Sequence, residues 1–159
     1  MAYAGIEVAL ESRQQMDHVG KPVPDQADPL TAPFWKAASE ERLVIQRCQN
    51  CKTYHHPPLG ICWSCLSTDL KFEEVSGRGR VYSYAIVRDQ RLPAFDSLIP
   101  YIAATVALDE APDVTLATNL PGTSIDEVQI DLKVHVEFDE IAPGIKIPQF
   151  RDVTVGGDA

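Results

Sequence analysis

The four cysteines of this chain form two Cys-x-x-Cys pairs, and no cysteine occurs elsewhere in its 159 residues. Cys48 and Cys51 make the first pair, Cys62 and Cys65 make the second, and ten residues separate the pairs. This spacing is typical of a zinc ribbon, because each two-residue gap lets a tight turn offer two thiolates to one tetrahedral ion. The sequence therefore predicts a Zn²⁺ site with all four cysteines as ligands.

The sequence gives less support to other roles for these cysteines. Disulfides persist mainly in oxidising compartments, whereas we expect this chain in the cytoplasm. A redox role would need a βαβ unit around one pair, and no such pattern is present. Four thiolates also fill the coordination sphere of zinc, so the predicted site is structural. His55 and His56 are rival ligands, which we interpret as hairpin residues that precede Pro57 and Pro58.

The expected location follows from the targeting signals that the sequence lacks. The apolar share of 45% is enough for a core, but no run approaches the roughly 20 apolar residues of a membrane-spanning helix. The N-terminus has no basic start, and Glu7 interrupts its apolar residues, which is unlike a secretory signal. We therefore expect a cytoplasmic protein with no membrane partner.

The formal net charge of −9 is distributed unevenly along the chain. The last 51 residues hold eleven acidic side chains and three basic ones, whereas residues 42–91 hold eight basic and four acidic ones. Nucleic-acid affinity depends largely on neutralising phosphates, so a chain this acidic is a poor general nucleic-acid binder. The local basic segment could hold a small anionic ligand, and the alternative is that its charges lie on solvated strand faces.

The first part of the chain is predicted to contain little regular structure. Residues 1–30 read as an extended arm with an apolar patch at Ile6, Val8 and Leu10. Thr31 as the N-cap and a proline in the first turn predict a helix over 32–41. This helix carries Phe34 and Trp35, which either pack on the ribbon or face a partner. Strands at 43–48 and 71–76 flank the cysteines, so residues 31–75 form the helix and ribbon unit.

The rest of the chain is predicted to be mostly β. Apolar residues alternate with polar ones between turn signals, which predicts strands at 80–89, 101–109, 114–120, 132–139 and 145–151. Five such strands over residues 76–153 favour an OB-fold barrel, followed by a tail at 154–159. Pro148 favours an edge position for the last strand. His135 falls on the polar face of its strand, so we expect a surface residue.

No catalytic set is recognisable in this sequence. It has no dinucleotide-binding glycine fingerprint, phosphate loop, Gly-x-Ser-x-Gly or His-Glu-x-x-His, and no cysteine is left to act as a nucleophile. These absences favour a protein that does not catalyse a reaction by itself.

The order of motifs resembles the family called domain of unknown function 35, over about residues 30–153. The matching motifs are Pro33-Phe34-Trp35, Gln46-Arg-Cys-x-x-Cys, His56-Pro-Pro, Cys62-x-x-Cys, Ser76-Gly-Arg-Gly-x-Val-Tyr-Ser83, Pro100-Tyr and Pro148-Gln-Phe-Arg151. The resemblance implies a rubredoxin-like zinc ribbon joined to an OB-fold. It also implies a non-catalytic accessory subunit of thiolases, or of related aldolases, that act on coenzyme A (CoA) thioesters. Their acyl groups include those of aromatic and steroid side-chain degradation.

This resemblance gives the basic segment a candidate ligand. CoA carries a diphosphate and a 3′-phosphate, and guanidinium groups bind phosphate oxygens with two parallel hydrogen bonds. The candidate CoA-binding residues are Lys71, Arg78, Arg80, Arg88 and Arg91, with Trp63 or Tyr54 stacking on the adenine. The candidate partner surface comprises Ile6, Val8, Leu10, Phe34 and Trp35. The CoA thioester could be shared with a thiolase-like catalytic subunit.

Two other functions stay open at this point. Zinc ribbons and OB-folds also bind single-stranded nucleic acid, and Tyr82 and Tyr84 on the first barrel strand could serve as stacking platforms. The acidic C-terminal part argues against this function. An independent hydratase or aldolase is the third possibility, and the lack of an acid–base pair or an open metal site argues against it.

Overall fold

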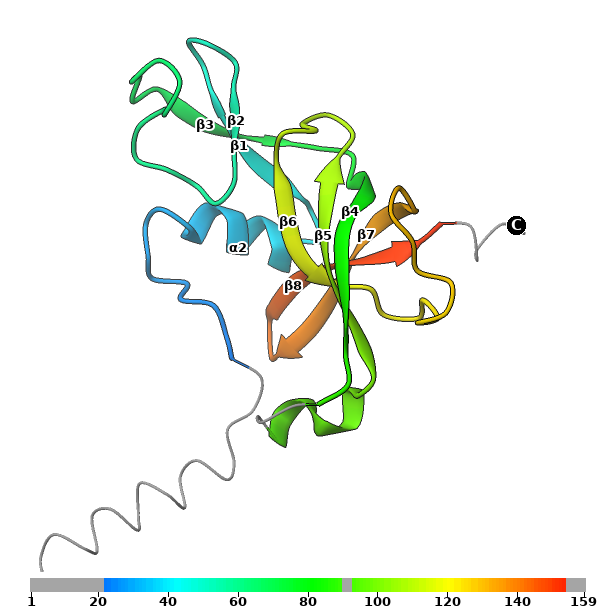
Figure 1. Ribbon diagram of the computed structural model, residues 1–159. Coiled ribbons are helices and arrows are strands. Elements are labelled where there is room, and N and C mark those ends of the chain that lie inside the picture. Colours follow the sequence, from blue (N-terminus) through cyan, green and yellow to red (C-terminus); the bar gives the residue numbers. More distant parts are fainter. Residues whose placement is uncertain (1–21, 90–92, 154–159) are drawn as a thin grey trace, which may run out of the picture.

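The computed structural model describes residues 22–89 and 93–153, which form a three-stranded ribbon, a short helix and a five-stranded barrel (Figure 1). Three predicted parts lie outside these residues: the apolar patch at Ile6, Val8 and Leu10, the candidate Arg91, and the tail at 154–159. Within the described part of the chain, no helix combines the length and apolar character needed to cross a membrane.

Helix α2 (Ala32–Ser39) is shorter at its C-terminal end than the predicted 32–41. The expected side-chain cap is wrong, because the Thr31 hydroxyl donates to Asp28 Oδ2 at 2.9 Å instead of accepting from the helix. The helix ends where Glu41 adopts a φ of 59°. There the N–H of Glu41 donates to Ala38 O and the N–H of Arg42 to Ala37 O. These two bonds form a Schellman motif, which stops the helix two residues early.

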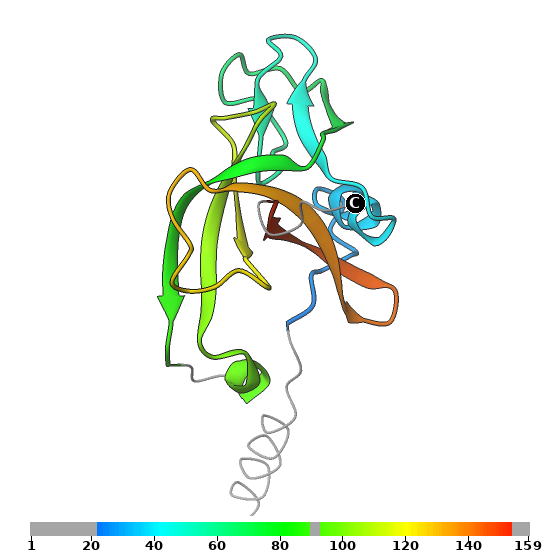
Figure 2. The same cartoon turned by 90° about the vertical axis from the view of Figure 1, so that its right-hand side faces the viewer.

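The ribbon is an antiparallel sheet of β1 (Val44–Cys48), β2 (Tyr54–His55) and β3 (Leu70–Glu74) in the order β2-β1-β3. The first cysteine pair begins at Cys48, the last residue of β1, and the second lies in the long connection between β2 and β3. The predicted strands at 43–48 and 71–76 are thus confirmed within one or two residues at their ends. In Figure 2 the ribbon lies above the barrel.

The barrel strands are β4 (Arg78–Val87), β5 (Tyr101–Leu108), β6 (Thr115–Asn119), β7 (Lys133–Ala142) and β8 (Ile145–Asp152). A 3₁₀ helix, η2 (Pro93–Leu98), connects β4 to β5. The strands pair antiparallel in the order β6-β5-β4-β7-β8. Burial alternates along β5 as predicted, and the mostly β fold class is confirmed.

The barrel is not closed by a backbone ladder. Among the described residues, β6 pairs only with β5 and β8 pairs only with β7, so both are edge strands. The predicted edge position of Pro148 is therefore confirmed. The N–H of Asn119 donates to Oε1 of Gln149 at 3.0 Å, so a side chain bridges the seam between β6 and β8. Such a partly open barrel is typical of the OB-fold.

One cluster of buried side chains runs through all three parts. Phe34 of α2 and Ile45 of β1 belong to the same cluster as Val81 of β4 and Phe150 of β8. Ile45, Val81 and Phe150 are fully buried. The helix and the ribbon are thus packed on the barrel by shared apolar burial.

Gly77, at the junction of ribbon and barrel, permits a test of this packing. It has a φ of 75°, and a Cβ there would collide with Cγ1 of Val136. We expect Gly77→Ala to lower the free energy of unfolding by roughly 2–4 kcal/mol, from left-handed backbone strain and overpacking. Urea unfolding measures the change. Gly60→Ala is the matched control, because its Cβ would meet nothing within 4 Å. Equal stability of the two variants would contradict this account.

Candidate metal centre and neighbouring surfaces

The four cysteines converge on one point. Their sulfur atoms all lie within 4.8 Å of one another, with Cys48 Sγ 3.6 Å from Cys65 Sγ and Cys51 Sγ 3.5 Å from Cys62 Sγ. Four thiolates bound tetrahedrally at 2.3 Å from a zinc ion would be about 3.8 Å apart, close to these separations. The cluster can therefore hold a metal ion through residues from both pairs.

The two cysteine pairs are folded alike. In each, the residue after the second cysteine has a positive φ, 65° at Lys52 and 61° at Leu66. The N–H of Lys52 donates to Cys48 O at 3.0 Å, and the N–H of Leu66 donates to Cys62 O at 2.9 Å. Positive φ is uncommon outside glycine, and here each turn directs two sulfurs to the same side. The sequence spacing predicted this convergence, but it did not reveal the two left-handed residues.

The thiols differ in their proton affinity. The Thr53 hydroxyl, 3.2 Å from Cys51 Sγ, is the main cause that lowers the pKa of Cys51 to about 5. Burial raises the pKa of Cys62 to about 11. Cys51 therefore gives up its proton more readily than Cys62, and a bound cation would displace the proton of Cys62. Thr53 was missed at the sequence level, because its role depends on the fold of the turn.

The two histidines are not part of the sulfur cluster. His55 on β2 is 2% exposed, and neither of its ring nitrogens has a hydrogen-bond partner among the described residues. Its ring and that of Trp63 form a T-shaped contact with 6.1 Å between centroids. The ring of His56 packs on Phe34 at 5.2 Å, and burial lowers its pKa. His55 is the last residue of β2 and His56 follows it, close to the hairpin position that the sequence suggested.

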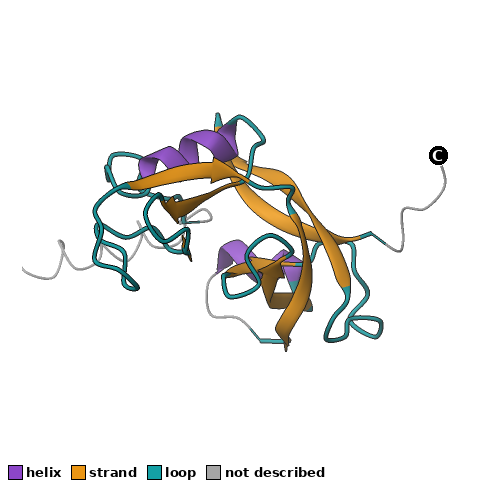
Figure 3. Ribbon diagram, turned by 90° about the horizontal axis from the view of Figure 1, so that it is seen from above, coloured by secondary structure: helices purple, strands orange, loops and turns teal. Residues whose placement is uncertain are grey.

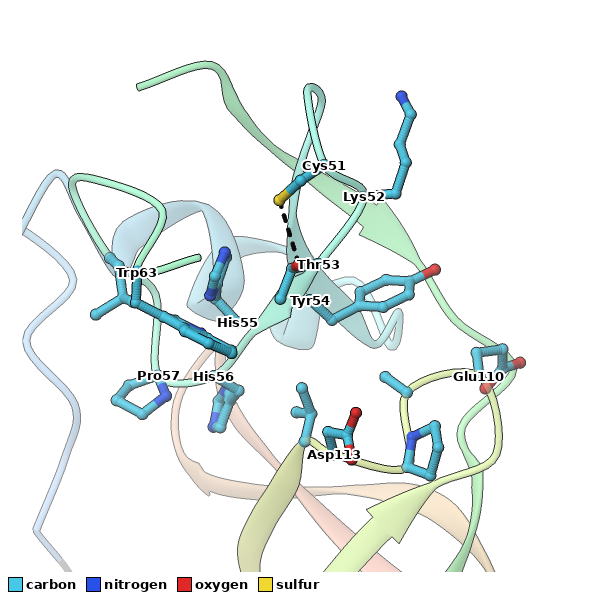
Figure 4. Close-up of a pocket in the computed structure, with 14 residues that line it drawn as sticks. Cys51, Lys52, Thr53, Tyr54, His55, His56, Pro57, Trp63, Glu110 and Asp113 are labelled. Carbon is cyan, nitrogen blue, oxygen red and sulfur yellow. Dashed lines mark hydrogen bonds between the residues drawn. The ribbon is translucent and has the colours of Figure 1, made fainter. Parts of the chain in front are cut away.

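A cleft of about 620 Å³ separates the ribbon from the turn between β5 and β6. Figure 4 shows Trp63 and His55 on the ribbon side, with Glu110 and Asp113 on the turn. Trp63 is 68% exposed, so its ring is available to a planar ligand or to a protein surface. Of the candidate CoA-binding cations that the structure describes, which are Lys71, Arg78, Arg80 and Arg88, none lines this cleft.

The described candidate cations are spread over different elements. Arg78 and Arg80 lie at the start of β4, whereas Arg88 follows its end. Ten residues of extended chain separate Arg78 from Arg88 by roughly 30 Å. Lys71 lies on the ribbon strand β3. The described candidates therefore lie on different elements and at opposite ends of a long strand, and their binding of one CoA molecule stays a prediction.

Arg78 and Arg80 remain as a local basic pair. Both side chains are exposed, and Arg80 lies directly opposite Lys133 on β7. Arg78 lies opposite His135, with its Nε 3.9 Å from Asp109 Oδ2. His135 is exposed, as predicted for a surface residue.

The two aromatic residues of α2 have different environments. Phe34 is 4% exposed and packs in the common core, which is the packing alternative of the two considered for this residue. Trp35 packs edge-to-face on Phe34 at 4.8 Å between centroids and is half-buried. Only Trp35 of this pair is left to face another surface.

Comparison with known proteins finds a matching family model for the ribbon and another for the barrel. Residues 35–71 match the model of the ChsH2 rubredoxin-like zinc ribbon domain, and residues 72–139 match that of the ChsH2 C-terminal OB-fold domain. A DUF35 domain-containing scaffold protein of Methanocaldococcus jannaschii is 30% identical over 72% of this chain and 80% of that protein. The solved Ltp2-ChsH2(DUF35) aldolase contains a chain that is 39% identical, with a TM-score of 0.73 over 81% of this chain and 98% of that one.

A further relative is much longer than this chain. The probable enoyl-CoA hydratase alpha subunit of Thermomonospora curvata is 42% identical over 119 residues, which are 74% of this chain. They make up only 36% of the hydratase subunit, so this chain spans about a third of its length.

The hydrogen bond from Thr53 should set the acid sensitivity of the metal centre. Replacing the hydroxyl in Thr53→Val raises the pKa of Cys51, so protons compete better with the metal. We expect the chain loaded with Zn²⁺ to release the ion at a higher pH than the parent, measured with a chromogenic chelator. Thr68→Val is the control, since Thr68 is exposed in the same ribbon. Release at the same pH in all three proteins would contradict the role of Thr53.

Proposed function

This chain belongs to the DUF35 family of zinc-ribbon and OB-fold proteins, and from that premise we propose that it is a non-catalytic accessory subunit of a thiolase-superfamily enzyme. The enzyme, a thiolase or a retro-aldolase, acts on CoA thioesters. The observation that carries the proposal is the likeness, at 39% identity and a TM-score of 0.73, to a chain of the Ltp2-ChsH2(DUF35) aldolase.

The proposed metal is a structural Zn²⁺ held by Cys48, Cys51, Cys62 and Cys65. A donor set of four sulfurs suits zinc, and it leaves no coordination position for a substrate. The ion would stabilise the ribbon, where only short strands surround the cysteines. In this role the metal orders the ribbon and takes no part in the chemistry.

The partner is proposed to carry the catalytic residues and the pocket for the acyl group. Two features of this chain support this division: its metal ligands are all cysteines, and its sequence has no catalytic motif. Trp35, half-buried beside the core, is a candidate contact with the partner. A CoA thioester bound to the partner is proposed to contact this chain through Arg78 and Arg80. Lys133 lies opposite Arg80 on the neighbouring strand.

Affinity purification of the tagged full-length chain from its native cells tests the proposal. We expect a thiolase-like protein in stoichiometric amount, identified by mass spectrometry, and turnover of a CoA thioester by the complex but not by this chain alone. A chain that purifies alone and turns over a CoA ester would overturn the accessory role.

The basic pair generates a separate prediction. Arg78→Ala combined with Arg80→Ala should weaken binding of CoA esters to the purified complex at least about tenfold, because charged hydrogen bonds to phosphate are lost. Calorimetric titration measures the affinity. Arg88→Ala, at the other end of β4, is the control and should bind normally with the same zinc content. Unchanged affinity in the double variant would remove the pair from the CoA site.

A further inference from the structure

The cleft between the ribbon and the barrel combines an exposed aromatic ring with acidic side chains. Seen from above, the ribbon and α2 lie toward one end of the molecule, and the barrel strands extend toward the other (Figure 3). The cleft of about 620 Å³ lies where the turn between β5 and β6 approaches the ribbon. Trp63 on the ribbon side is 68% exposed, and Glu110 and Asp113 lie on the turn (Figure 4).

The two carboxylates of the turn differ in their contacts. Oε1 of Glu110 accepts the backbone N–H of Ser76 at 2.9 Å, so Glu110 is already engaged at the junction of ribbon and barrel. Asp113 is exposed, and no ion pair or hydrogen bond from another described residue reaches its carboxylate. Among the described residues that line the cleft, Lys52 is the single lysine or arginine, and Figure 4 shows its side chain directed away from the turn. Asp113 therefore has a negative charge available for a cation from outside the chain.

A buried histidine also lines the cleft and lacks hydrogen-bond partners. His55 is 2% exposed, and no described residue bonds to either of its ring nitrogens. Its T-shaped contact with Trp63 places it next to the exposed ring. Buried polar groups in native proteins are nearly always hydrogen-bonded, because an unpaired one costs free energy. A donor that entered beside Trp63 would satisfy the accepting nitrogen of the neutral imidazole.

The guanidinium group of an arginine side chain matches these three features. It stacks on aromatic faces, binds a carboxylate with two parallel hydrogen bonds, and has further N–H donors. An uncharged apolar side chain would leave Asp113 and His55 without partners.

The phosphates of CoA fit this cleft less well than a guanidinium. They would meet the negative charges of Glu110 and Asp113, and none of the described candidate CoA-binding cations lines the cleft. Exposed tryptophans are also frequent anchors at the centre of protein interfaces. Charge and chemistry together therefore favour a basic side chain carried by another protein.

We propose that this cleft receives an arginine side chain of a partner protein, with its guanidinium stacked on Trp63 and paired with Asp113. One of its N–H groups donates to His55. Trp63 lies between Cys62 and Cys65, so the fold of the second cysteine turn positions the docking ring. The inference assigns the arginine to the catalytic subunit and in this respect rests on the proposed function.

The test titrates the catalytic subunit, once affinity purification has identified it, with purified variants of the full-length chain in a calorimeter. Asp113→Asn should raise the dissociation constant at least about tenfold, because charged hydrogen bonds are lost. Trp63→Leu should also weaken binding, whereas Asp113→Glu keeps the charge and should bind nearly as the parent does. Asp126→Asn is the matched control, since it removes the same charge from an exposed carboxylate outside the cleft. Equal zinc content in all variants shows that the ribbon is folded.

Three results would overturn the inference. Dissociation constants that are unchanged in Asp113→Asn and Trp63→Leu would overturn it alone and leave the accessory role intact. A purification that recovers no catalytic subunit would overturn the proposed function and this inference together. A change of Trp63 fluorescence on adding CoA to the isolated chain, measured with Trp35→Phe, would assign the cleft to the adenine of CoA instead.

Discussion

Burial of one continuous apolar cluster connects every part of this structure. Ile45 of the ribbon lies in the same cluster as Val81 and Phe150 of the barrel, and all three are fully buried. The strand that ends at Cys48 is therefore held by the barrel core as well as by its neighbours in the ribbon. This connection positions the cysteine turns relative to the barrel, and with them the cleft between Trp63 and Asp113.

The environments of Cys51 and Cys62 show how the ribbon balances charge. A hydroxyl donor lowers the pKa of Cys51, whereas burial raises the pKa of Cys62. Because Cys62 holds its proton strongly, all four sulfurs would become thiolates only if a cation offset their mutual repulsion. The same arrangement supports the structural role proposed for the metal, because the four sulfur atoms converge on one point.

The open seam of the barrel has a different physical origin. Pro148 has no N–H to donate, and the side chain of Gln149 takes the place of a backbone partner for Asn119. Small residues such as Ala85 and Ala103 then leave space beside the seam. Edge strands and small side chains together produce a groove that is lined by uncharged residues. The basic pair at Arg78 and Arg80 points outward from the start of β4, so the chain separates its apolar and its basic surfaces.

The sequence by itself determined the cysteine cluster, the ribbon, the five strands and the edge position of Pro148, because cysteine spacing, alternation and proline act locally. Only the tertiary structure decided which of the candidate site residues lie close together. It buried Phe34, separated Arg78 from Arg88 along one strand, and ended the helix at Ser39 through the left-handed Glu41. It also placed the Thr53 hydroxyl against Cys51. These outcomes depend on strand length, turn geometry and packing between distant segments, which residue types in a linear pattern do not specify.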